Sequence, residues 1–538
     1  MKWLHNWLVG VSLCCLVGCE SDPVAEAGTN DSDSPDISES AIWQKFDSGS
    51  SDNLLIDYSY AGYKRGEESI PDVSTLGYST FDITDYGAVA NDGISDRAAF
   101  VAAAAAIKAN GSGILYIPEG TFDIHTADDT SESIIITTSN LILKGESREK
   151  SILKMSAPMQ PADPDVLYSS PVLIYLKHNS TISHVSDIVG DSPKGSFSVE
   201  LSSAASISKS DWVCLKLEDN SEDLIAQSLG DYRSDLLGSE YDINTTGIQV
   251  WEYHQVKEVS GNIITFYEPL MNDVDSRWNW TINSYPHYSG VGVEDLTFEG
   301  SSKEDFIHHG TWEDDGAYKP INLMRLTNSW MRRVTFRNVS EASSIVNSAN
   351  VSVYDISIEG NNGHSAIRAQ CSSRVLLGAI TDLTGGGVGQ FHSTGVSYQS
   401  IGTVLWRCEW GSDSCFESHA SQPRATLIDH CKGAFIEMRQ GGDTKFLPSH
   451  MEDLTIWNLN ATRVSTSENF KWWQTSSFKF LPPIIVGIHG AEVEFDSEQI
   501  KYQESNGKAV YPESLYEAQL KRRLGSTPAW MTELKTEL

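Results

Sequence analysis

The sequence predicts an all-β protein that folds as one long parallel β-helix with an N-terminal capping helix. Short strands of alternating apolar and polar residues recur, each followed by a polar turn, as in VEDLTFEG, MRRVTFRN, VSVYDISIEG, GTVLWRCEW and MEDLTIWNLN. Their anchor residues follow one another at steps of 22, 21, 28, 22 and 27 residues: Val334, Ile356, Leu377, Leu405, Leu427 and Leu454. No single coil of this size buries its apolar side alone, so the coils must stack into a continuous core.

The composition is that of a globular protein with enough length for a large core. Of the 538 residues, 40% are hydrophobic and 21% are charged. The domain count stays open, because repetitive all-β chains of this length also form single units. The formal net charge is -34, from 39 Lys and Arg against 73 Asp and Glu. Such a field repels phosphate backbones and anionic lipids, so we expect no nucleic-acid partner.

The N-terminus resembles a bacterial lipoprotein signal peptide over residues 1–18. Lys2 precedes an apolar run that ends in Leu16-Val17-Gly18-Cys19. This resemblance implies cleavage before Cys19, lipidation of its thiol and a place in the cell envelope, with membrane contact through that lipid alone. A plain secretory signal is the alternative. Residues 19–54 are rich in Ser, Asp, Pro and Gly, and predict a disordered acidic tether.

The segment FDITDYGAVANDGISDRAAFVAAAAAIKANGSGILYIPEGTFDI begins the expected folded domain. Ser95 or Asp96 caps an alanine-rich helix over residues 97–109, and a strand follows at 114–117. The motifs Asp85-Tyr86-Gly87-Ala88 and Asn91-Asp92-Gly93, together with the turn at 116–122, resemble the opening of the pectate-lyase-like superfamily. This resemblance implies a right-handed, single-stranded parallel β-helix. Activity stays open, because that superfamily includes hydrolases, lyases, epimerases and viral tailspikes.

We expect the β-helix domain to span residues 55–511, with an insertion at about 215–285. The tail at 512–538 contains ESLYEAQLKRRL, whose helical spacing predicts a cap on the last coil. Five cysteines lie beyond the signal region: Cys214, Cys371, Cys408, Cys415 and Cys431. The odd count and the lack of a C-x-x-C motif argue against a zinc site or a full disulfide framework, although one bridge is compatible with export. We expect a monomer.

A second set of short strands predicts a polar column on one face. SAIRAQ, GQFHST, SCFESH and AFIEMR precede the anchors, and we align Ile367, Phe391, Phe416 and Ile436 as inward positions. Period-2 alternation then points four pairs outward: Arg368 and Gln370, His392 and Thr394, Glu417 and His419, Glu437 and Arg439. A slip of one residue in any coil would reverse inside and outside there. The alternative is an ordinary solvated face.

Two reactions on a polysaccharide fit such a column. Glycoside hydrolysis, the first choice, needs two carboxyl groups, for which Glu417 and Glu437 are the candidates, with Asp443 in reserve. Elimination on a uronate polymer, the second, needs a cation for the substrate carboxylate and groups that move protons. The candidate cations are Arg368, Arg424 and Arg439, and the candidate proton carriers are His392, His419 and Tyr398. A surface protein that binds glycans without cleaving them is the third reading.

The expected catalytic residues are thus Glu417, Glu437, His392 and His419. The expected substrate-binding residues are Arg368, Gln370, Tyr398, Trp406, Arg407, Arg424, Arg439 and Asp443. The C-terminal third also resembles bacterial β-helix proteins associated with polysaccharide breakdown, through motifs such as Trp406-Arg407 and Gly441-Gly442. We expect no cofactor. The sequence has no clustered Asp pattern for calcium, and His308-His309 lacks further evident ligands for a metal.

Overall fold

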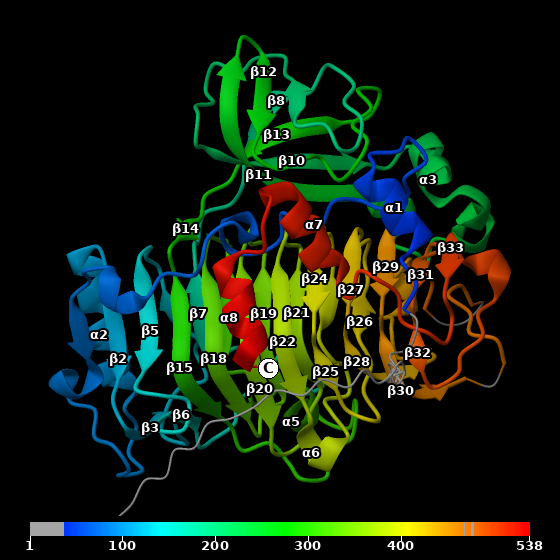
Figure 1. The fold of residues 1–538 in the computed structure, drawn as a ribbon. Helices are drawn as coiled ribbons and strands as arrows, with labels where there is room; N and C mark the ends of the chain where they lie inside the picture. Colours follow the sequence, from blue (N-terminus) through cyan, green and yellow to red (C-terminus); the bar gives the residue numbers. More distant parts are fainter. Residues whose placement is uncertain (1–36, 467, 475–477, 538) are drawn as a thin grey trace, which may run out of the picture. The chain divides into compact units, whose positions relative to one another are not determined.

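The computed structural model describes residues 37–466, 468–474 and 478–537. The predicted fold is confirmed, because parallel strands from successive coils form a right-handed β-helix (Figure 1). The expected signal peptide, Cys19 and the first part of the tether lie outside the described residues. Within the described part of the chain, no helix has the length and apolarity needed to span a bilayer.

The coils have three faces, and the first two belong to one 18-stranded sheet. Four long strands contribute to both of these faces: β15 (Gly292–Glu299), β18 (Trp330–Arg337), β20 (Ser352–Glu359) and β22 (Leu376–Asp382). Each bends at one residue with positive φ: Asp295, Arg333, Asp355 and Ala379. The first face also contains β1 (Thr80–Asp82), β2 (Gly113–Ile117), β5 (Leu141–Gly145), β24 (Val404–Trp406), β27 (Thr426–Asp429), β29 (Leu454–Trp457), β31 (Ile484–Val486) and β33 (Tyr502–Glu504).

Shorter strands complete the second and third faces. The second face contains β3 (Gly120–His125), β6 (Ser151–Met155), β25 (Glu409–Trp410), β28 (Lys432–Ile436), β30 (Asn460–Ser465) and β32 (His489–Gly490). The third face is a separate sheet of β4 (Ile134–Ile136), β7 (Ile174–Lys177), β16 (Ile321–Met324), β19 (Glu341–Val346), β21 (Ser365–Gln370), β23 (Gly395–Ser397) and β26 (Glu417–His419). A small pair, β14 (Tyr288–Ser289) and β17 (Leu326–Thr327), lies between turns.

Stacked aliphatic side chains fill the interior. One ladder of register partners crosses eight strands, and every member is buried: Val293, Met331, Val353, Leu377, Leu405, Ile428, Ile456 and Ile485. Each coil thus covers the apolar side of its neighbour, as the repeat predicts. The first coils are covered by α2 (Arg97–Asn110), whose Phe100 and Ile107 are fully buried against them. Gly111 ends α2 with φ 86°, a left-handed conformation that favours glycine.

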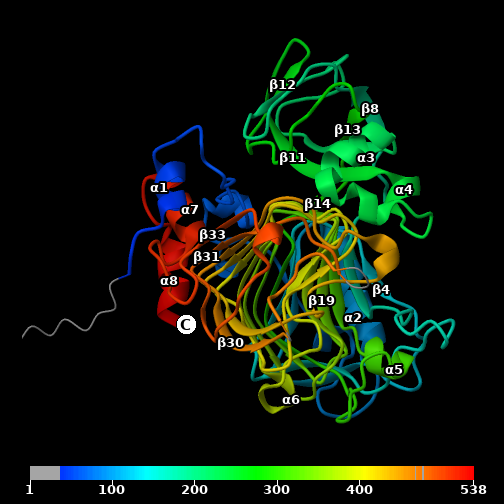
Figure 2. The same cartoon turned by 90° about the vertical axis from the view of Figure 1, so that its right-hand side faces the viewer.

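The C-terminal tail lies along the first face rather than over the last coil. Helices α7 (Leu515–Leu524) and α8 (Ala529–Glu537) lie there beside α1 (Ala41–Asp47), on one flank of the β-helix (Figure 2). They cover outward apolar side chains such as Trp330, Trp406 and Trp457, which would otherwise face water. The expected tether therefore ends earlier than residue 54, because Ile42 and Trp43 of α1 are buried in this cluster.

The insertion is an antiparallel unit with its own core, and it starts earlier than residue 215. Its strands, in sheet order, are β8 (His184–Asp187), β13 (Trp280–Ser284), β10 (Trp212–Asp219), β11 (Ile248–Ser260), β12 (Ile263–Phe266) and β9 (Ser198–Glu200). Helices α3 (Glu222–Leu229) and α4 (Ile243–Thr246) accompany them. The two remaining helices, α5 (Trp312–Asp315) and α6 (Thr384–Gly387), lie in turns between coils.

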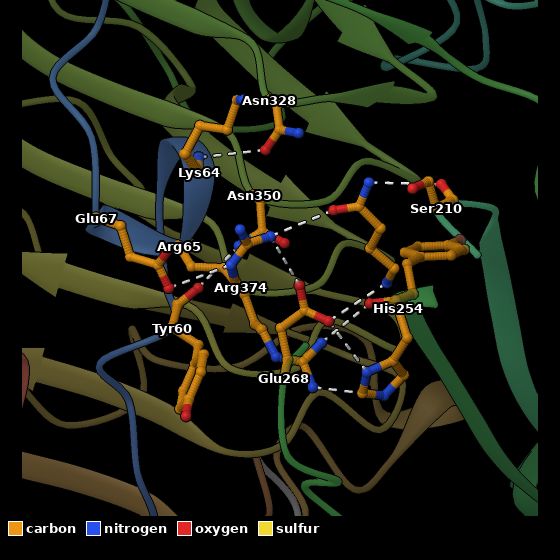
Figure 3. A network of polar contacts seen from close by, with 12 residues as sticks. Tyr60, Lys64, Arg65, Glu67, Ser210, His254, Glu268, Asn328, Asn350 and Arg374 are labelled. Atoms are coloured by element: carbon orange, nitrogen blue, oxygen red, sulfur yellow. Dashed lines mark hydrogen bonds and ion pairs between the residues drawn. The ribbon is translucent and has the colours of Figure 1, made fainter. Parts of the chain in front are cut away.

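A buried charge network joins the insertion to the coils (Figure 3). Arg374, next to β22, donates to Glu252 of β11 and to the carbonyl oxygen of Pro269. His254 lies between two buried carboxylates, 3.0 Å from Glu252 Oε1 and 3.5 Å from Glu268 Oε2. Burial alone would raise the pKa of Glu252, but His254 and Arg374 lower it to about 2. Removal of any one charged partner would therefore leave a buried charge without its counter-charge.

Candidate functional site on the third face

Strand register brings Arg368 and Glu417 together on the outer side of the third face. Arg368 of β21 pairs with Gly395 of β23, which pairs with Glu417 of β26. Gly395 has no side chain, so the two flanking side chains meet across it, with Arg368 Nη2 2.5 Å from Glu417 Oε2. A Cβ at position 395 would lie 2.0 Å from the Glu417 carbonyl oxygen. The glycine is thus a steric requirement of the pair.

Two histidines contact the other oxygen of Glu417. His419, two residues along β26 and on the same side, has Nδ1 2.5 Å from Oε1. His392 Nδ1 lies 3.2 Å from that oxygen. Its ring nitrogen lacks hydrogen-bond geometry there, so we treat the contact as electrostatic. The side chain of Glu417 is fully buried, whereas 39% of the His419 side chain is exposed.

The charges around Glu417 fix its protonation state. Burial opposes ionisation, but Arg368, then His392 and His419, hold the pKa of Glu417 well below its usual range. Burial also lowers the pKa of His392 well below the ordinary histidine value, despite the attraction of Glu417. An ionised carboxylate only accepts hydrogen bonds, so His419 donates from Nδ1, and in the neutral ring Nε2 is the atom that carries the lone pair. The site therefore contains a carboxylate–imidazole pair.

A second histidine group adjoins this pair. His308 stacks on Phe391 with ring centroids 3.6 Å apart, and the guanidinium of Arg439 lies 3.7 Å from the centroid of the same ring. His308 and His364 each lie 5.2 Å from His392, centroid to centroid. Ring nitrogens of His308, His309 and His364 lie within 4.8 Å of one another, so these three residues form the candidate metal-binding group among the described residues.

The structure brings some of the expected site residues together in a different register. Gly395–Ser397, not GQFHST, forms the strand beside β21, a slip of three residues relative to the expected alignment. The turn with α6 and Gly389, whose φ is 88°, lengthens the connection between β22 and β23. The strand β23 therefore begins later in the sequence than expected. His392 still reaches the face through an isolated bridge to Ser365. Gln370 donates to Ser344 Oγ on the same face.

Glu437 does not join this group, because AFIEMR belongs to the second face. Strand β28 pairs with β25 and β30, and Gly441 takes the place beside Ser418 on the third face. Glu437 Oε1 accepts from Gln474 Nε2 at 2.7 Å instead. The alternation of apolar and polar residues does not show which face of a coil a strand occupies. For this reason the sequence placed Glu437 on the wrong face. Tyr398 is half-exposed directly after β23, and its N–H donates to Ala420.

Four further expected residues have other partners. Trp406 and Arg407 contact Glu517 of α7 on the first face. Arg424 is buried and donates to Asn272 in the insertion. Asp443 is exposed and caps a short turn at Thr444–Phe446. Trp406, Arg407 and Arg424 therefore have partners away from Glu417. Asp443 instead follows Gly442, where an added Cβ would lie 3.0 Å from His419 Nδ1.

Two residues beside His392, namely His364 and Glu341, were missed in the sequence. His364 directly precedes β21, and its Nδ1 lies 3.4 Å from Glu341 Oε1 at the start of β19. Glu341 opens β19 and pairs with Ser365, which in turn pairs with His392, and His364 directly precedes Ser365. A polar residue repeated at the entry of successive strands is the signal that could have found them. Burial opposes ionisation of Glu341, but Lys319 and His364 lower its pKa to about 2.

A cavity away from this site has no comparable chemistry. It measures about 450 Å³ and lies between the N-terminal segment and the insertion, beside Leu55, Phe197 and Met271. Its charged groups pair with one another, since Lys194 Nζ and Lys501 Nζ lie 2.5 and 3.0 Å from the two oxygens of Asp453. It offers no free acid–base pair comparable to Glu417 and His419, so we place the candidate site on the third face.

The chain is similar to one sequence family and to several solved structures. A family described as a domain of unknown function, DUF4955, matches residues 389–534. No curated protein sequence matches. Similar solved structures include the tailspike protein gp49 from Pseudomonas phage LKA1, with 13% identity, coverage of 80% of this chain and 79% of that chain, and a TM-score of 0.43. Another is the Azotobacter vinelandii mannuronan C-5 epimerase AlgE4 A-module, with 11% identity, coverage of 80% and 95%, and a TM-score of 0.37. A third is PfbA, a surface adhesin of Streptococcus pneumoniae, with 11% identity, coverage of 77% and 80%, and a TM-score of 0.36.

Proposed function

We propose that this protein is an enzyme that cleaves a uronate-containing polysaccharide by β-elimination on the third face. The observation that carries the proposal is the Glu417–His419 pair, in which a buried, ionised carboxylate orients an exposed imidazole. A stack of coils also suits a linear polymer, because each coil presents a further set of side chains to the next sugar. The proposal reverses the order expected from sequence, where hydrolysis came first.

Elimination fits the protonation states better than hydrolysis does. A glycosidase needs one carboxyl group that keeps its proton and a second carboxylate about 5–9 Å away. Glu437 is on another face, and the pKa values of both Glu417 and Glu341 are low, so neither holds a proton to donate. An imidazole with a free Nε2, by contrast, is suited to removing a carbon-bound proton.

The reaction assigns a role to each group. His419 Nε2 takes the C5 proton, the released electron pair forms the C4=C5 double bond, and the C4–O bond breaks. Glu417 holds His419 in the productive tautomer and stabilises the imidazolium that forms. Arg368 keeps Glu417 ionised and in place. Tyr398, whose backbone pairs beside His419, is the candidate donor of a proton to the leaving oxygen, and Arg439 is the candidate cation for the substrate carboxylate.

The test is incubation of the full chain with neutral, sulfated and uronate polysaccharides, following new reducing ends and the ultraviolet absorbance of unsaturated uronate. The proposal predicts both signals together on a uronate polymer. Reducing ends without absorbance would make the protein a hydrolase. Binding without either signal would make it a glycan-binding protein. Either result overturns the proposal.

We also propose export and lipid anchoring through Cys19, on the support of the N-terminal sequence pattern. Mass spectrometry of the protein purified from membranes of its bacterial host tests this directly. A mature chain that begins at a diacylated Cys19 is expected. A chain that retains residues 1–18, or one cleaved elsewhere without lipid, would contradict it.

A further inference from the structure

The histidines beside the proposed catalytic pair have unused ring nitrogens. His308 and His309 lie in the turn before α5, and His364 precedes β21. The Nε2 atoms of His308 and His364 are buried and have no hydrogen-bond partner, and only 7% of His364 is exposed. Buried polar atoms without partners are rare, because each costs the free energy of its lost hydration. Both nitrogens are therefore available to a ligand.

Carboxylates fix the orientation of two of these rings. Asp315, whose side chain is fully buried, has Oδ2 2.6 Å from His309 Nδ1, and its Oδ1 accepts the backbone N–H of His309 at 3.0 Å. Glu341 Oε1 lies 3.4 Å from His364 Nδ1. A carboxylate on Nδ1 leaves Nε2 as the ligand atom and raises its basicity, which is the usual arrangement behind metal-bound histidines.

We propose that His308, His309 and His364 bind a divalent transition-metal ion such as Zn²⁺, with Asp315 and Glu341 orienting the ligands. Imidazole nitrogens suit zinc and its first-row neighbours, whereas calcium and magnesium prefer oxygen ligands. Three protein ligands with one open position are typical of catalytic rather than structural zinc sites. This differs from the metal-free site expected from sequence.

The distances are compatible with such a site after a small closure. A tetrahedral ion with Zn–N bonds of about 2.0–2.1 Å places its ligand nitrogens about 3.4 Å apart. One ring nitrogen of each histidine now lies within 4.8 Å of the corresponding atoms of the other two, and His309, with 55% of its side chain exposed, has room to rotate. His392 borders both His308 and His364, so the open position adjoins the proposed catalytic pair. The binding claim itself does not rest on the proposed function.

The experiment measures metal binding by the full chain, prepared without an affinity tag and stripped with a chelator. Isothermal titration with Zn²⁺ is expected to give one tight site, and Co²⁺ is expected to give the visible absorption bands of a tetrahedral complex. His309→Ala should weaken Zn²⁺ binding at least 100-fold and abolish the Co²⁺ bands. Asp315→Asn should weaken binding by about 10–100-fold, the usual effect of losing such an orienting partner.

His184→Ala is the matched control, because His184 is also an exposed histidine beside an aspartate, with Nε2 2.8 Å from Asp187 Oδ1. It should bind Zn²⁺ like the unaltered chain. Thermal unfolding of each metal-free variant verifies that it is folded. The proposal is overturned if the unaltered chain binds neither ion stoichiometrically, or if His309→Ala binds both as the unaltered chain does. Neither result depends on whether any polysaccharide is cleaved.

Discussion

Glu417 carries a negative charge on the third face chiefly because the guanidinium of Arg368 lies beside it, with two imidazole rings on the other side of the carboxylate. Arg368 contacts one oxygen, and His392 and His419 face the other. All four residues were expected from the sequence, because they are polar residues of neighbouring short repeated segments. Glu341 and His364 were missed, because their importance depends on contacts with the turn at His308 and His309 and on charges from other coils.

Substitution of Glu417 tests the role of the pair. Glu417→Gln removes the charge that stabilises the His419 imidazolium, so elimination should fall by about 10²–10⁴-fold, the usual contribution of such proton transfer. Steady-state kcat with a cleaved uronate polymer measures this. Glu437→Gln is the control, because the structure places Glu437 on the second face, and its activity should stay within about two-fold of the unaltered chain. Equal losses in both variants would favour a two-carboxylate hydrolase instead.

At the scale of elements, the repeat predicted the coils correctly and their faces incompletely. Two of the five anchor pairs are in register, Val334 with Ile356 and Leu377 with Leu405. The other three anchors miss by one or three residues: Ile356 pairs with Ile380, Leu405 with Ile428 and Leu427 with Thr455. The strand at 395–397 and the face of β28 differed, because turn lengths change from coil to coil and alternation has the same period on every face. Apolar periodicity therefore predicts a coil better than it predicts which side of the coil a strand forms.

Gly395 provides a test of the register. Gly395→Ala should force β23 and β26 apart, since its Cβ would lie 2.0 Å from the Glu417 carbonyl oxygen. We expect a loss of about 1–3 kcal/mol in the free energy of unfolding and a marked loss of activity. Gly190→Ala is the control, because the nearest atoms to its Cβ belong to the side chain of Glu200, at 3.0 and 3.1 Å, and not to a neighbouring backbone. Urea unfolding checks both, and an unchanged Gly395→Ala protein would contradict the register.

At the scale of the whole molecule, the insertion and the flanking helices complete a surface that the coils leave open. The sequence indicated an inserted segment and a helical tail, but not their contacts. These depend on pairs far apart in the chain, such as Arg374 with Glu252 and Trp406 with Glu517. No local pattern encodes such pairs.

The pH dependence of stability tests the link between insertion and coils. The lowered pKa of Glu252, about 2 against an ordinary 4.5, means that its carboxylate stabilises the fold above pH 4.5 and that this contribution is lost as the pH falls toward 2. Glu252→Gln should therefore cost about 3–5 kcal/mol at pH 7, and the cost should shrink below pH 4.5. Glu258→Gln, at an exposed position on the same strand, should cost less than about 0.5 kcal/mol. A pH-independent cost would contradict the network.

The proposed β-elimination is tested most directly by following the C5 proton that His419 is proposed to remove. A uronate polymer deuterated at C5 is digested with the full chain, and the products are analysed by mass spectrometry. The account predicts unsaturated products that have lost the C5 deuterium to solvent, formed by the unaltered chain and by His184→Ala but not by His419→Ala. Saturated products that retain the deuterium, or equal turnover by His419→Ala, would contradict it.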